Sequence, residues 1–110
     1  MSPRVLVPRE LALRDVDEAV AWYVAEADPD TALRFIDALE RAYTHISDHP
    51  AAGSPRMAHE LNLAGLRFWP LAGFPFLVFY VEQSAHVDVW RVLHAHRDVA
   101  VWLQESDEHA

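Results

Sequence analysis

Two consecutive segments, residues 74–82 and 86–94, most constrain the fold, because each has apolar side chains on both faces of an extended backbone. Side chains alternate between the two faces of a strand. In the first segment one face carries Phe74, Phe76, Val78 and Tyr80, and the other carries Leu77, Phe79 and Val81. Such segments are typical of central strands. The connection at residues 83–85 is short enough for an antiparallel hairpin.

The same alternation predicts which residues of 86–94 share a face. One face would carry Val87, Val89, Arg91 and Leu93, and the other Asp88, Trp90, Val92 and His94. Towards the end of this strand the chain places four basic side chains close together: Arg91, His94, His96 and Arg97. This is the densest cationic cluster in the sequence, so it is a candidate functional site.

Two helices precede these strands. Residues 9–27 have apolar side chains at intervals of three and four, the pattern of an amphipathic helix. Asp28 and Pro29 are typical of the start of a second helix, which ends near His49 and Pro50. Because the connection is so short, the two helices must form an antiparallel hairpin.

The remaining elements are shorter. Residues 4–7 predict a brief strand ending at Pro8, and residues 65–71 a strand that forms a hairpin with 74–82. Residues 50–63 are predicted to be a loop, since proline and glycine interrupt regular structure there. Residues 99–105 predict a short helix with Asp98 as its N-cap.

The order strand, helix, helix, strand, strand, strand predicts a single α+β domain over residues 1–110. In this fold the helical hairpin packs on one face of a four-stranded, mostly antiparallel sheet, and a short helix ends the chain. The second face then has no evident cover, and an exposed apolar patch usually marks a partner surface. In the alternative, the first strand, the 49–63 loop and the terminal helix together cover that face.

Composition narrows the class of function. The net charge of −8 argues against direct DNA binding by this chain alone, because phosphate contacts require an excess of Lys and Arg. The charge is uneven: residues 10–48 hold ten acids and three arginines, whereas residues 49–97 hold three acids and four arginines. There is no cysteine, no uninterrupted membrane-spanning run and no signal-peptide pattern, so we expect a cytoplasmic protein.

An ordered set of short motifs resembles the RelE/ParE superfamily of bacterial type II toxins, and most of all its ParE branch. The motifs are Trp22-Tyr23, Pro29 with Ala32 and Phe35-Ile36, Pro50 with Gly53 and Pro55, Gly65-Leu66-Arg67, Phe79-Tyr80, and RVLHAHRD at 91–98. One position departs from the ParE pattern, because the residue between His94 and His96 is often glycine there and is Ala95 here. An alanine would be strained in a turn that needs a positive φ.

The resemblance implies a toxin of a toxin–antitoxin module of the plasmid stabilization type, and a cognate antitoxin that neutralises it. The toxin would form a homodimer, or a heterotetramer with the antitoxin. ParE-like members are described as binding DNA gyrase, which implies a gyrase inhibitor without cofactors and not an enzyme. The alternatives are a RelE-like ribosome-dependent mRNA endoribonuclease and a non-toxic member that serves only in complex assembly. In a ribonuclease, Arg67 and Arg97 would hold the phosphate charge and His94 would transfer protons. The net charge of −8 favours target binding over RNA cleavage.

Candidate site residues come from the cationic cluster and from the aromatic side chains. Target binding is assigned to Arg67, Arg91, His94, His96 and Arg97. Antitoxin binding is assigned to Trp69, Phe76, Tyr80 and Trp90, because large aromatic side chains dominate interface energetics.

Several of these residues also have purely structural interpretations. Arg91 could pair with Asp37 or Glu40, and Arg97 with Asp98. His94 and His96 share a face, but two histidines without a third ligand make a poor zinc site, so no metal is expected. The aromatic residues of the two helices are assigned to the core: Trp22, Tyr23, Phe35 and Tyr43.

Overall fold

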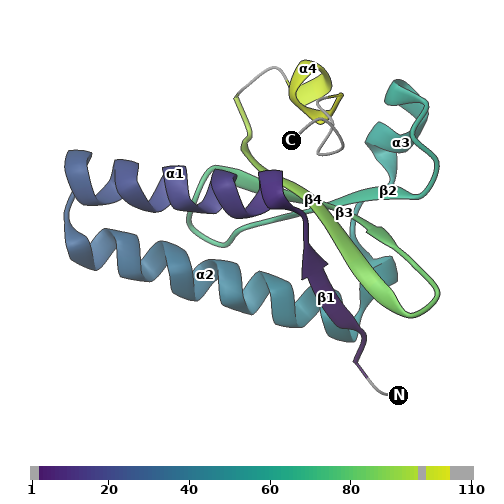
Figure 1. Cartoon of the computed structure of the whole chain (residues 1–110), viewed down its shortest axis with the longest axis horizontal. Coiled ribbons are helices and arrows are strands. Elements are labelled where there is room, and N and C mark those ends of the chain that lie inside the picture. Colours follow the sequence, from purple (N-terminus) through teal and green to yellow (C-terminus); the bar gives the residue numbers. More distant parts are fainter. Residues whose placement is uncertain (1–2, 97–98, 105–110) are drawn as a thin grey trace.

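The computed structural model describes residues 3–96 and 99–104, and its elements follow the predicted order (Figure 1). They are β1 (Val5–Pro8), α1 (Glu10–Glu26), α2 (Pro29–Asp48), β2 (Leu66–Pro70), β3 (Phe76–Glu82), β4 (His86–His94) and α4 (Val99–Leu103). The predicted α+β fold, with a helical hairpin on a four-stranded sheet and a short helix after it, is confirmed. None of the helices in the described residues has the length and apolar character needed to cross a membrane.

The sheet is mixed and has the strand order β1-β4-β3-β2. β1 runs parallel to β4, while β3 is antiparallel to both β4 and β2. β1 pairs only with residues 86–89 of β4. Residues 90–94 of β4 therefore have a neighbouring strand on the β3 side alone.

The start of α2 is capped as predicted. The Asp28 carboxylate accepts from the backbone N–H of Thr31 at 2.7 Å, and Pro29 occupies the first turn. This hydrogen bond stabilises the ionised carboxylate, so the pKa of Asp28 is lowered from its ordinary value. A satisfied N-cap fixes where the second helix begins.

Aromatic rings of the helical hairpin α1–α2 pack against aromatic rings at and just before the start of β3, on the first face of the sheet. Phe35 of α2 lies 5.5 Å from Phe74 and 5.2 Å from Phe76, both edge to face, and Tyr23 of α1 lies 5.3 Å from Phe74. Edge-to-face pairs of this kind add to the energy of simple burial. The predicted core assignment of Tyr23 and Phe35 is confirmed, since both are buried.

The second face of the sheet is largely covered, so the expectation of an open face is wrong. α3 (Arg56–Leu61), a helix inside the segment predicted to be a loop, and α4 pack on this face. They bury Leu66, Phe79, Val81 and Leu93. β1 is not part of the cover, because it lies within the sheet as an edge strand.

The end of the second face at β1 does remain exposed. Val7 pairs with Asp88, which in turn pairs with Val81 of the second face. Val5 and Val7 are 68% and 46% exposed. The uncovered part of the face is thus a narrow strip along one edge strand.

A β-bulge at Trp90 changes the predicted faces of β4. Tyr80 pairs with Val89 but Phe79 pairs with Arg91, so Trp90 is an extra residue in the ladder. After the bulge Val92 faces the helical hairpin, whereas Leu93 faces α3 and α4. The prediction that Val87, Val89, Arg91 and Leu93 share one face is therefore wrong beyond Val89.

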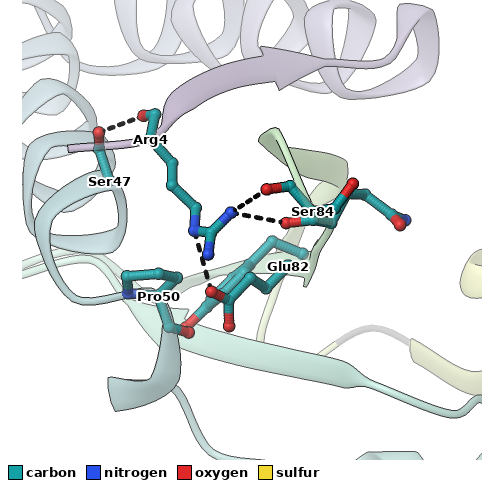
Figure 2. A network of polar contacts seen from close by, with 7 residues as sticks. Arg4, Ser47, Pro50, Glu82 and Ser84 are labelled. Carbon is teal, nitrogen blue, oxygen red and sulfur yellow. Dashed lines mark hydrogen bonds and ion pairs between the residues drawn. The ribbon is translucent and has the colours of Figure 1, made fainter. Parts of the chain in front are cut away.

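Arg4, just before β1, binds the β3–β4 hairpin and the end of α2 (Figure 2). Its guanidinium donates to the carbonyls of Gln83 at 2.9 Å and Ser84 at 2.6 Å, and pairs with Glu82 at 3.0 Å. Its backbone is hydrogen-bonded to Ser47 near the end of α2. This network holds β1 in register with β4, and so fixes where α1 starts.

Candidate functional site

A groove of about 610 Å³ opens between α1 and the end of β4. α1 supplies one wall, and the start of β3 and the end of β4 supply the other. The described lining residues are Asp15, Glu18, Ala19, Trp22, Tyr23, Pro75, Phe76, Val92, Leu93 and His94. A groove of this volume is large enough for a small ligand or for several side chains of a partner protein.

The groove exists because β1 is short. The strand ends at Pro8, and the backbone N–H of Arg9 donates to the carbonyl of Val89 at 2.9 Å before the chain turns into α1. α1 then lies alongside the part of β4 that has no strand partner on this side (Figure 1). A helix cannot continue the β-ladder, so a cleft remains between the two.

A buried ion pair closes the floor of the cleft. The Asp15 carboxylate accepts from Nε and Nη2 of Arg91, both at 2.7 Å, and from the backbone N–H of Val92 at 3.0 Å. The exposed fractions of the Arg91 and Asp15 side chains are 4% and 8%. Arg91 also donates to the carbonyl of Trp102 in α4 at 2.8 Å. The pair thus joins α1, β4 and α4, and its bidentate geometry fixes their relative position.

The mouth of the groove is apolar with one acidic side chain. Trp22 is 59% exposed and stands edge to face against the ring of Tyr23 at 5.2 Å. Across the groove, the His94 ring lies edge to face against Phe76 at 5.2 Å. Glu18 is exposed on the α1 wall. An exposed tryptophan beside half-buried aromatic rings is typical of a protein-binding surface.

The predicted cationic cluster does not form one surface. Arg91 is buried against Asp15, in place of the predicted Asp37 or Glu40. His94 and His96 lie together at the end of β4, with ring centres 5.3 Å apart. Arg97 lies outside the described residues, together with its expected partner.

Comparison with known proteins assigns the family. The model of the ParE toxin of the type II toxin–antitoxin system parDE matches residues 6–99. The chain belongs to the ParE toxin family. A solved chain from the chromosomal ParDE toxin–antitoxin system of P. aeruginosa has the same fold, with a TM-score of 0.71. It is 19% identical and the match covers 84% of this chain and 97% of that one. A search of curated proteins gave no match.

In this ParE-type toxin the residues suggested for RNA cleavage are far apart. Arg67 of β2 pairs with Tyr80 and His94 of β4 with Phe76, so they lie on opposite sides of β3 and four residues apart along it. Strand spacings place the Cα atoms of Arg67 and His94 roughly 17 Å apart. Arg67 also donates to the carbonyl of Gly53 at 2.8 Å, so it holds the loop before α3. These two side chains are not positioned to act on one phosphate.

Two of the predicted antitoxin anchors differ sharply in exposure. Phe76 is half-buried and lines the groove of the ParE-type toxin. Tyr80 is fully buried, and its hydroxyl donates to the carbonyl of Pro50 at 2.8 Å and accepts from the N–H of Gly53 at 2.9 Å. Tyr80 is therefore a structural residue in this conformation, which corrects its assignment as an anchor.

The two predicted tryptophan anchors lie on opposite faces of the sheet. Trp69 packs on the helical side, where its ring stacks on that of His45 at 4.1 Å. Trp90 lies on the second face, donates from Nε1 to Asp88 at 3.0 Å, and has the Arg9 guanidinium 4.6 Å from its ring centre. Neither side chain is among the described residues that line the groove.

The groove residues of α1 were missed by sequence reasoning, which assigned Trp22 to the core. Trp22 and Tyr23 are adjacent on a helix and point about 100° apart, so only one of them can face the sheet. Tyr23 continues the buried series of Ala12 and Ala19, which leaves Trp22 outside. Glu18 precedes Trp22 by four residues and so shares its flank.

The turn after β4 is less strained than the family pattern predicted. Among the described residues, Asn62 is the only non-glycine with a positive φ, so Ala95 adopts an ordinary conformation. No cluster of three or more potential metal ligands occurs in residues 3–96 and 99–104. His94 and His96 thus gain no third protein ligand within that part of the chain.

Proposed function

We propose that this ParE-type toxin acts in the cytoplasm by binding DNA gyrase, and that a cognate antitoxin neutralises it by placing a segment in the groove between α1 and β4. The observation that carries the antitoxin site is the groove itself, and the gyrase target is inferred from membership of the ParE family. On a chain of this family the groove presents Trp22 at 59% exposure beside the half-buried ring of Phe76. Tryptophan side chains in pockets of this kind supply much of the energy of protein interfaces.

The distribution of charge supports binding over RNA cleavage. Arg67 of β2 and His94 of β4 lie on opposite sides of β3, beside Tyr80 and Phe76, and Arg91 is neutralised by Asp15. The net charge of −8 would also slow association with ribosomal RNA. A protein target lacks the continuous phosphate charge that causes this penalty in RNA.

The target is tested by expression and two assays. We expect growth arrest after induction of the gene, inhibition of DNA supercoiling when the purified chain is added to gyrase, and intact transcripts on translating ribosomes. Cut transcripts with unaffected supercoiling would establish the ribonuclease in its place. Growth without arrest would identify a non-toxic family member.

The groove is tested with two alanine variants. Trp22→Ala removes the exposed ring, whereas Leu33→Ala removes another exposed apolar side chain, 60% exposed, from outside the described groove lining. The probe is the antitoxin encoded beside this gene. We expect Trp22→Ala to weaken the complex about 30-fold and Leu33→Ala to change it less than about twofold. Equal affinity for Trp22→Ala and wild type would exclude the groove as the antitoxin site.

A further inference from the structure

We propose that the antitoxin segment held in the groove is basic, with a Lys or Arg side chain beside Glu18 and an apolar side chain against Trp22 and Phe76. This inference rests on the proposed function, because it specifies the chemistry of the segment that the groove receives. It does not follow from membership of the family. It follows from the charges of α1 and from the apolar wall opposite.

α1 is an acidic helix. It holds five acids and one arginine in 17 residues: Glu10, Asp15, Asp17, Glu18 and Glu26 against Arg14. Asp15 is neutralised by Arg91. Within the described residues Glu18 makes no ion pair, and it lies on the groove wall. Within the described residues the groove therefore presents one carboxylate without an ion pair next to its most exposed aromatic ring.

The opposite wall does not balance this charge. It is formed by Pro75, Phe76, Val92, Leu93 and His94, of which His94 alone can ionise. The ring of His94 packs edge to face against Phe76 and lies near the ring of His96. Among the described residues that line the groove there is no Lys or Arg, so a basic side chain of a partner would be the first fixed cation at this wall.

Glu18 and Trp22 are separated by one helical turn, so their side chains are neighbours. A segment that covers the ring of Trp22 also removes water from the Glu18 carboxylate. Burying a carboxylate without a partner is costly, whereas a cation placed beside it recovers the lost hydration. An acidic segment would be repelled by Glu18 and by the net charge of −8.

The chain already contains the contact that we infer for the partner. The Arg9 guanidinium lies 4.6 Å from the ring centre of Trp90 while it pairs with Asp88 at 2.8 Å. An arginine of the partner could bind Glu18 and Trp22 in the same way, since a guanidinium combines a planar face with a fork of donors.

The test compares adjacent acids of α1. Glu18→Gln and Glu18→Arg alter the groove, whereas Asp17→Asn and Asp17→Arg change the net charge equally at an exposed position outside the described groove lining. The probe is again the antitoxin encoded beside this gene, titrated by calorimetry at 50 mM and 300 mM NaCl. We expect about threefold weaker binding for Glu18→Gln and about tenfold or more for Glu18→Arg. Both Asp17 variants should stay within about twofold of wild type, and salt should reduce the differences.

The outcomes separate the two proposals. If Trp22→Ala weakens the complex while the Glu18 variants bind like the Asp17 variants, or more tightly than wild type, the basic segment is refuted and the groove remains. If Trp22→Ala has no effect, both proposals fall together. Urea unfolding of each variant confirms that the compared proteins are folded.

Discussion

Replacing Asp15 with alanine would show how strongly α1 is held to β4. The change removes the acceptor of three hydrogen bonds, from Nε and Nη2 of Arg91 and from the backbone of Val92. Arg91, whose side chain is 4% exposed, would lose its bidentate ionic partner, and its hydrogen bond to the neutral carbonyl of Trp102 would not replace that charge. Breaking a buried pair in this way costs about 3–5 kcal/mol. That is a large part of the roughly 5–15 kcal/mol that stabilises a domain of this size.

The assay is urea unfolding followed by circular dichroism. With a denaturant dependence of about 2 kcal/mol per molar urea, the midpoint for Asp15→Ala should fall by about 2 M. Asp17→Ala, on an exposed face of the same helix, should stay within about 0.5 kcal/mol of wild type. The double variant Asp15→Leu with Arg91→Met should recover most of the loss, because apolar residues of similar volume can replace a buried ion pair. A loss below about 1 kcal/mol for Asp15→Ala would refute the structural role of the pair.

Three further predictions concern single residues. Gly53→Ala should lower the free energy of unfolding by about 3 kcal/mol, because the added Cβ would overlap the Tyr80 hydroxyl; unchanged stability in urea would contradict this contact. Burial raises the pKa of Tyr43 from 10.0 to about 12, so the folded state retains this proton longer than the unfolded chain does, and stability should fall as the pH rises from 10 towards 12. Tyr43→Phe should flatten that slope in urea titrations, and an unchanged slope would argue against the shift. Because the cap lowers the pKa of Asp28, its contribution is present above about pH 4 and lost as the pH falls through the folded pKa. Asp28→Ala should therefore lower Tm at pH 7 but hardly at pH 2, and an equal loss of Tm at both pH values would contradict the role of the ionised cap.

Local patterns were sufficient to predict the helical hairpin and the antiparallel strands. The intervals of three and four in α1, the Asp28-Pro29 start of α2 and the two-faced apolar β3 are each encoded within a few residues. The structure has these elements at the predicted positions, because each pattern acts through contacts within its own segment. The layers of the fold follow from those elements.

The second face and the bulge could not be predicted in the same way. α3 has six residues between Pro55 and Asn62, too few to show a helical period, and it was hidden among the residues that indicate a loop. The extra residue at Trp90 depends on how β4 pairs with β3, which no local pattern reports. One inserted residue reverses the faces of everything after it.

The candidate site was misjudged for a related reason. Arg91 was grouped with His94 and Arg97 because they are close in sequence. Its side chain is instead bound by Asp15, 76 residues earlier in the chain, on a helix that was expected only to cover the sheet. Proximity along a strand does not indicate which charges remain available once another element packs beside it.

The short β1 explains both the ion pair and the groove. An exposed strand edge invites pairing with any extended chain, and proteins usually protect such edges. Here Asp15 occupies the N–H of Val92 at the open edge of β4, so unspecific strand addition at that position would have to displace a buried carboxylate. Glu18, three residues after Asp15 on the same helix, stands at the mouth of the cleft beside Trp22. If a partner segment does supply both an apolar side chain for the ring and a cation for the carboxylate, as proposed above, the two contacts together would make this exposed edge selective for that segment.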